Sequence, residues 1–200
     1  MHLIGLEGLE TMDEGEAAAI KSRIVEMFGD FHDDVIIEEI YFYGERTPAT
    51  VYLSPDSSFE VAICIPSHQA DNPLARLFHL AHELVHCLTP NGLPSYQATV
   101  LEEGLCEHAK VYLGREAYQA EYPDFDFRDS SPPGKYRKAF DAVEDLVLHE
   151  GLSEMRLAIR NLRRETNLPF AKITRNHLSA RFRNSPPELL SSNFSEWDGR

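Results

Sequence analysis

The segment 73–90, PLARLFHLAHELVHCLTP, limits how this chain can fold more than any other part of the sequence. Apolar residues recur along it at the spacing of an α-helix, at Leu74, Leu77, Ala81, Leu84 and Leu88. Other faces of the same helix also carry apolar side chains, at Leu80, Val85 and Cys87. A helix that is apolar nearly all round has to be buried, so the rest of the chain must pack around it.

The remaining patterns predict a mixture of helices and strands. Helical spacing covers 13–28, 99–113, 135–149, 153–165 and 174–183, and strand-like runs cover 35–44, 49–53 and 59–65. The segment SPDSS supplies the turn of a hairpin between the last two strands. Thr11 with Glu14 fits a capping box, Thr174 fits an N-cap, and Gly29 and Gly114 fit helix ends.

We therefore expect an α+β fold. A small mixed sheet of about three or more strands should pack on the 73–90 helix, and a mainly helical part should follow it. Residues 1–184 should form a single domain, and 185–200 should be a flexible tail because Pro and Ser are frequent there and no periodicity is present.

Composition narrows the class of protein. The 200 residues are 42% hydrophobic and 26% charged, with a formal net charge of −14, which is typical of a soluble globular domain. This acidity disfavours nucleic acid as a partner, since no basic excess is present to neutralise phosphates. No apolar run is long enough to cross a bilayer, and the N-terminal residues lack a signal-peptide pattern. Three cysteines without a CxxC pair favour reduced, buried thiols, so we expect a cytoplasmic protein.

The central helix contains the pentapeptide His82-Glu83-Leu84-Val85-His86. Residues four apart lie on one face of a helix, so both histidines can bind one metal ion. Burying two histidines and a glutamate would be costly without such a partner. This HExxH spacing is typical of catalytic zinc sites, in which the glutamate takes a proton from a zinc-activated water. We expect one zinc ion per chain, with Glu83 as the general base.

A third ligand must come from elsewhere, because hydrolytic zinc sites usually have three protein ligands and an open position. The metzincin pattern would need glycine at 89 and histidine at 92, whereas this chain has Thr89 and Gly92. The next helix offers carboxylates instead, in the segment LEEGLCE, 101–107. Glu102, Glu103 and Cys106 are all candidates there, and Gly104 would let another element approach closely.

HELVH followed by EEGLCEHA resembles the gluzincin branch of the zincin metallopeptidases, the thermolysin-like group with a His, His, Glu zinc site. The resemblance covers about residues 59–113. It implies that Glu103 is the third ligand and that Glu107, one turn later on the same face, accepts a hydrogen bond from a zinc histidine. Glu102 stays the rival ligand, although we expect it to be solvated or at the rim of a cleft. A His, His, Cys site with Cys106 also stays open.

The resemblance also implies an activity, that of a zinc metallopeptidase acting on a peptide or protein substrate. Its substrate would pair with an edge strand before the active-site helix, here about 59–65, although this segment also fits an interior strand. A tyrosine or histidine after the glutamate helix would stabilise the oxyanion. The candidates are Tyr112, Tyr118, Tyr122, Tyr136, His149 and His177, and we favour Tyr136 and His149, which flank the same predicted helix.

Two further histidines can be assigned environments from their places in the helices. His79 lies one turn before His82 and fits either a neutral core residue or a partner of the zinc ligands, whereas His108 should face away from the metal.

Two other functions also fit the sequence. The chain could be a regulatory protease that cuts one repressor-like or antitoxin-like partner. It could also be a non-catalytic binding module stabilised by zinc, although a structural site would not need Glu83. The sequence does not indicate the oligomeric state.

Overall fold

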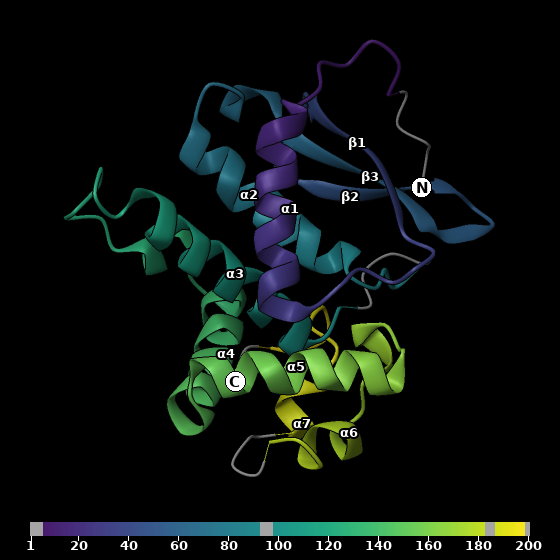
Figure 1. The fold of residues 1–200 in the computed structure, drawn as a ribbon, viewed down its shortest axis with the longest axis vertical. Helices are drawn as coiled ribbons and strands as arrows, with labels where there is room; N and C mark the ends of the chain where they lie inside the picture. The colour runs from purple at the N-terminus through teal and green to yellow at the C-terminus, as the bar shows by residue number, and fades with distance from the viewer. Residues whose placement is uncertain (1–5, 93–97, 183–186, 199–200) are drawn as a thin grey trace.

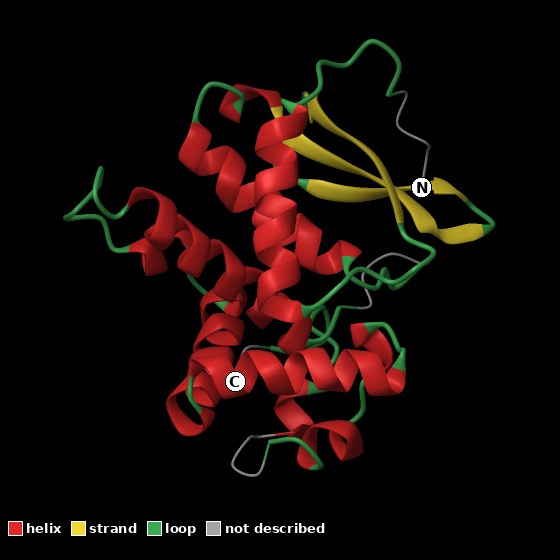
Figure 2. Cartoon of the chain, in the orientation of Figure 1, coloured by secondary structure: helices red, strands yellow, loops and turns green. Residues whose placement is uncertain are grey.

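The computed structural model describes residues 6–92, 98–182 and 187–198. These residues form an α+β fold with seven α-helices and a three-stranded mixed sheet, and the C-terminal part is helical (Figure 2). The elements are α1 (Glu14–Phe28), β1 (Ile36–Tyr43), β2 (Ala49–Ser54), β3 (Ser57–Pro66), α2 (Pro73–Cys87), α3 (Val100–Tyr118), α4 (Lys135–Glu150), α5 (Leu152–Thr166), α6 (Arg175–Ser179) and α7 (Pro187–Leu190). Three short 3-10 helices lie at Ser67–Gln69, Phe127–Ser130 and Phe170–Lys172. The predicted fold class is confirmed.

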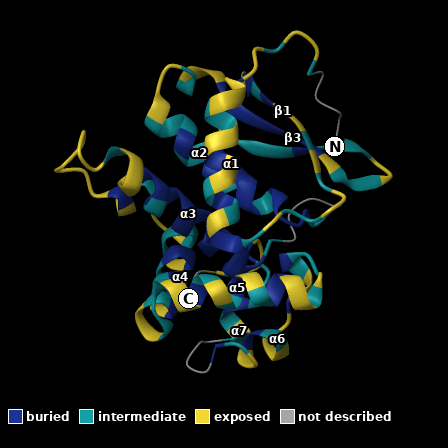
Figure 3. Ribbon diagram, viewed as in Figure 1, coloured by how far each residue is buried: buried dark blue, intermediate teal, exposed yellow. Residues whose placement is uncertain are grey.

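Helix α2 lies in the middle of the molecule, as its all-round apolar pattern predicts. It packs against α1 and the sheet on one side and against α3 on the other (Figure 1). Asn72 caps its N-terminus through a side-chain hydrogen bond to the backbone N–H of Ala75, and Pro73 occupies its first turn. Of its fifteen residues, seven are buried and only Pro73 is exposed (Figure 3). The two histidines of the pentapeptide are therefore held on a rigid central element.

The sheet has the strand order β1-β3-β2, with β3 parallel to β1 and antiparallel to β2. The expected substrate strand, 59–65, lies in β3 and is hydrogen-bonded on both sides, so the expectation that it is an edge strand is wrong. Its run Val61–Ile65 is buried, and a continuous apolar run is typical of an interior strand. The edge strand beside α2 is β2.

Helix α3 continues to Tyr118 and passes through Gly114, which we expected to end it. A Cβ atom at Gly114 would overlap the ring of Phe78, so this glycine makes room for a neighbouring side chain. Gly104 has the close approach that the sequence suggested. A Cβ there would overlap the carbonyl oxygen of Ala139 and the side chain of Val143, both in α4.

Both ends of the chain differ from expectation. Asp13 rather than Thr11 caps α1, because Thr11 forms a β-bridge with Tyr41. The flexible tail expected at 185–200 is wrong for the described residues 187–198. They contain α7 and an antiparallel bridge between Thr99 and Asn193, and the ring of Phe194 packs on Tyr136.

The cysteines Cys64, Cys87 and Cys106 are free and buried, as expected of core residues. Within the described ranges, no helix has the length and the apolar character that crossing a membrane requires.

Candidate metal centre

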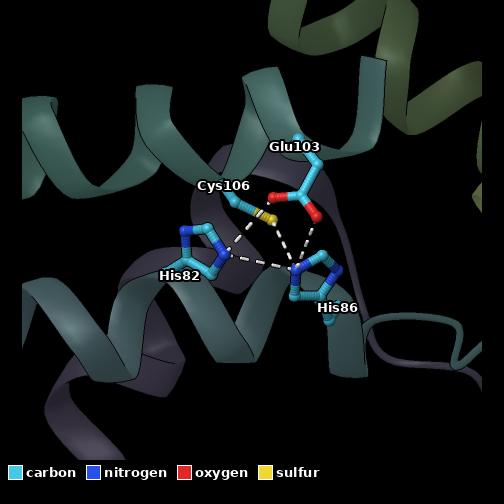
Figure 4. Close-up of side chains that lie close together, drawn as sticks. All are labelled: His82, His86, Glu103 and Cys106. Carbon is cyan, nitrogen blue, oxygen red and sulfur yellow. Dashed lines mark hydrogen bonds and ion pairs between the residues drawn. The ribbon is translucent and has the colours of Figure 1, made fainter. Parts of the chain in front are cut away.

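His82 and His86 lie on consecutive turns of α2, and their Nε2 atoms are 3.3 Å apart (Figure 4). Each ring uses its other nitrogen to contact a carboxylate of α3. His82 Nδ1 lies 2.9 Å from Glu107 Oε1, and His86 Nδ1 lies 2.8 Å from Glu102 Oε1. A carboxylate accepts a hydrogen bond, so each Nδ1 carries a proton, and each Nε2 presents a lone pair when the imidazole is neutral. Two lone pairs at this separation repel each other unless a cation lies beside both.

Two further donor atoms face the same point. Glu103 Oε2 is 3.5 Å from His82 Nε2, and Glu103 Oε1 is 3.8 Å from His86 Nε2. Cys106 Sγ is 3.5 Å from His86 Nε2. One ligand atom from each of these four residues lies within 4.8 Å of the others, so the group can hold a metal ion. Glu103 Oε2 is buried without a hydrogen-bond partner among the described residues, and a cation would satisfy it.

The local field favours positive charge at this point. Burial alone would lower the pKa of His86, but the sulfur of Cys106 and the carboxylate of Glu103 raise that pKa well above the ordinary histidine value. Burial also raises the pKa of Glu103, although both histidines oppose the shift. These side chains form a buried cluster of nitrogen, oxygen and sulfur donors, which suits zinc and related transition metals.

Glu102 is fully buried, so the expectation that it is solvated is wrong, although it does line the cleft. Besides its contact with His86 Nδ1, it accepts hydrogen bonds from Asn91 Nδ2 at 3.1 and 2.9 Å. Asn91 Oδ1 in turn accepts a hydrogen bond from the backbone N–H of Ala171. Glu102 therefore faces the outer nitrogen of His86, whereas Glu103, the next residue along α3, faces the inner nitrogens of both histidines.

Glu107 has the contact with His82 that the resemblance implies, and it has a second partner. Its Oε2 atom lies 2.6 Å from Nζ of Lys110, which is also buried and lies on the next turn of α3. Burial alone would raise the pKa of Glu107, but His82 and Lys110 lower it to about 2. Glu107 is therefore ionised and can accept the proton of His82 Nδ1. Sequence reasoning missed Lys110, although its three-residue spacing from Glu107 was a usable signal.

Glu83 belongs to the same cleft and has one oxygen fixed by the edge strand. Thr50 of β2 donates a hydrogen bond from Oγ1 to Glu83 Oε2 at 2.9 Å. The cleft has a volume of about 470 Å³. Its walls include three members of the metal-binding group, together with β2 and the start of α4. The lining residues include His82, Glu83, His86, Glu103, Pro48, Ala49, Thr50, Tyr52 and Tyr136. The sequence held no signal for Thr50, because strand pairing brings it to α2.

The two favoured oxyanion stabilisers lie in different places. The ring of Tyr136 is on the cleft wall, and its centroid is 6.2 Å from that of His82. His149 is exposed in the last turn of α4, thirteen residues after Tyr136, which is about 20 Å along a helix. His149 is therefore not at the site. Tyr112, Tyr118, Tyr122 and His177 are also absent from the described lining of the cleft.

The other two histidines have separate environments. His79 lines the cleft, and burial lowers its pKa to about 4, so it is neutral at pH 7. His108 faces away from the metal-binding group, as expected. Its Nδ1 atom lies 2.8 Å from Glu144 Oε1, and its ring stacks on Tyr112.

No protein-family model, no curated protein and no solved structure matches this chain.

Proposed function

We propose that this protein is a zinc metallopeptidase that hydrolyses peptide bonds with Glu83 as the general base. The observation that carries this proposal is the pair of His82 and His86 Nε2 atoms, 3.3 Å apart, facing the buried carboxylate of Glu103 in a cleft that also contains Glu83. His82, His86 and Glu103 are the expected zinc ligands. Two imidazoles with a carboxylate are a common ligand set of hydrolytic zinc enzymes.

Zinc bound at these residues would supply a water of lowered pKa and a Lewis acid for the peptide carbonyl. Glu83 takes the proton of the attacking water and transfers it to the leaving amine. The Thr50 hydroxyl holds Glu83 Oε2, so the carboxylate is oriented before a substrate binds. Glu107 and Glu102 accept the Nδ1 protons of the two histidines and thereby keep the Nε2 lone pairs directed at the ligand position.

The substrate class that fits the cleft is an extended peptide. The cleft is bordered by β2, whose far side carries no further strand in the described sheet. An extended peptide can add to such an edge through backbone hydrogen bonds, with its scissile bond over the metal-binding group. Tyr136, which also lines the cleft, is the residue we assign to stabilising the oxyanion. Restriction to a single repressor-like or antitoxin-like partner would change the substrate and leave this chemistry as it is.

Metal analysis combined with digestion of a broad peptide library tests the proposal. The wild type and Glu83→Gln should each bind about one zinc per chain, whereas His82→Ala and His86→Ala should lose it. Glu83→Gln keeps the size and polarity of the side chain but removes the base, so hydrolysis should fall by about 10²- to 10⁴-fold.

Glu38→Gln, a change at an exposed carboxylate of β1, is the matched control and should leave zinc content and hydrolysis unchanged. A Glu83→Gln variant that cleaves peptides at the wild-type rate would rule out Glu83 as the base. A wild type that neither contains nor takes up zinc would overturn the metal site.

A further inference from the structure

The donor atoms of the metal centre are spaced like the corners of one coordination tetrahedron. Zinc–nitrogen bonds of about 2.0–2.1 Å and zinc–sulfur bonds of about 2.3 Å place two nitrogens about 3.4 Å apart and a nitrogen and a sulfur about 3.5 Å apart in tetrahedral geometry. The two Nε2 atoms are 3.3 Å apart, and Cys106 Sγ is 3.5 Å from His86 Nε2. Glu103 Oε2 is 3.5 Å from His82 Nε2 and Glu103 Oε1 is 3.8 Å from His86 Nε2, so its carboxylate lies beside the same position.

The sulfur of Cys106 lies beside the metal-binding position because of where Cys106 stands on α3. It follows Glu103 by three residues, so both side chains leave the helix on the face that packs on α2. Figure 4 shows the sulfur and the Glu103 carboxylate directed at the same point, between the two imidazole rings. Cys64 and Cys87 are equally buried, but neither belongs to the metal-binding group.

We propose that Cys106 binds the metal as a fourth protein ligand and keeps the resting site closed. This inference rests on the proposed function and concerns its regulation. When the sulfur binds, the Cys106 thiol releases its proton to solvent and becomes a thiolate ligand. Water and substrate gain the fourth position only when the sulfur moves away, so Cys106 restrains hydrolysis until a substrate or partner opens the site.

A site closed by Cys106 should differ from an open His, His, Glu site in its metal affinity and in its rate of hydrolysis. Zinc sites with four protein ligands are typically structural, whereas catalytic sites keep a position for water. A chain that has both a fourth protein ligand and a general base should therefore hold its metal tightly and hydrolyse slowly. Removing the sulfur should weaken metal binding and increase hydrolysis by metal-loaded chains.

Cobalt(II) substitution reports the fourth ligand directly, because sulfur coordination adds a near-ultraviolet charge-transfer band to the visible bands of the bound ion. The wild type loaded with one equivalent of Co²⁺ should show both the visible bands and the charge-transfer band. Cys106→Ser should keep the visible bands and lose the charge-transfer band. Groups that only orient a ligand contribute about 10- to 100-fold to metal affinity, so loss of a direct ligand should weaken Zn²⁺ binding by at least about 100-fold. Cys106→Ala, assayed at saturating Zn²⁺, should hydrolyse peptides several-fold faster than the wild type.

Cys87→Ser is the matched control, since Cys87 is also buried and lies 3.6 Å from the Thr50 hydroxyl but outside the metal-binding group. It should retain both sets of bands. Visible bands without a charge-transfer band in the wild type would overturn the role of Cys106 and leave the proposed metal site intact. No cobalt bands at all would overturn both. The wild-type spectrum decides the question even where a variant fails to fold.

Discussion

At the scale of single residues, two adjacent glutamates of α3 contact different atoms of the histidines. Glu103 contacts the Nε2 atoms that face the ligand position, whereas Glu102 contacts the Nδ1 atom of His86. Successive residues of a helix point about 100° apart, so the two carboxylates approach the histidines from different directions. Glu107 contacts Nδ1 of His82, and Glu102 contacts Nδ1 of His86, so each imidazole has its own carboxylate partner.

Glu102→Ala should therefore weaken zinc binding, although Glu102 is not expected to touch the metal. Loss of its carboxylate leaves the Nδ1 proton of His86 without an acceptor and frees the imidazole to change tautomer or orientation. Partners of this kind typically contribute about 10- to 100-fold to metal affinity, which a chelator competition titration can measure.

Glu116→Ala is the control for this prediction, because Glu116 is an exposed residue of the same helix. It should bind zinc with wild-type affinity. An equal affinity for Glu102→Ala and the wild type would contradict the role that we assign to Glu102.

Sequence reasoning located the residues whose geometry depends on a single helix. The spacing of His82 and His86, and the common face of Glu103 and Glu107, follow from helical pitch alone. The contact of Glu102 with His86 was not expected, because the sequence does not reveal how α3 is oriented against α2. Thr50 and Asn91 were missed for the same reason, since long-range packing brings them to the site.

At the scale of elements, the close packing of α3 against α4 depends on Gly104. Its missing side chain lets the backbone of Ala139 and the side chain of Val143 approach α3 directly beside Glu103. The glutamate that faces the histidines thus lies next to a close contact between these two helices.

Gly104→Ala should lower the free energy of unfolding by about 1–3 kcal/mol, because the added methyl group meets backbone that cannot rotate away. This loss would occur even though alanine is favoured over glycine in a helix by about 1 kcal/mol. Urea denaturation of the metal-free protein measures the change without a contribution from the metal.

Gly15→Ala provides the comparison within another helix. Gly15 lies in the first turn of α1, and an added Cβ would meet only the side chain of Asp13. The change should alter the free energy of unfolding by less than about 1 kcal/mol. Equal stability of Gly104→Ala and the wild type would show that α4 can withdraw from α3 at little cost.

Element types were predicted more reliably from the sequence than element neighbours. The apolar periodicity of α2 implied its central place, and the hairpin of β2 and β3 follows from a short turn between two strand-like runs. The order β1-β3-β2 could not be deduced from the local patterns that we used, and this is why 59–65 was mistaken for the edge. The tail was misjudged because Phe194 packs on Tyr136, a contact between distant segments.

At the scale of the whole molecule, two of the polar junctions that join the N-terminal and C-terminal parts of the described chain lie near α2. The guanidinium of Arg163 in α5 donates to the carbonyl oxygens of Phe28, the last residue of α1, and Leu88, the residue that follows α2. Burial lowers the pKa of Arg163 to about 10, so it remains charged at neutral pH and can retain these hydrogen bonds. The metal-binding group is the second junction, since its residues come from α2 and α3.

Removal of the metal should therefore destabilise the entire fold. A ligand that binds only the folded chain adds about 2.7 kcal/mol of stability when its free concentration is a hundred times its Kd. For a domain of this size, 1 kcal/mol corresponds to about 2–4 °C in Tm, so a chelator should lower Tm by about 5–10 °C. Restoring Zn²⁺ should reverse the change. His82→Ala should melt at the same temperature with and without chelator, because it has no bound metal to lose. A wild type whose Tm is unchanged after confirmed loss of zinc would show that the packing of α2 on α3 does not depend on the ion, and the centre would then act in chemistry alone.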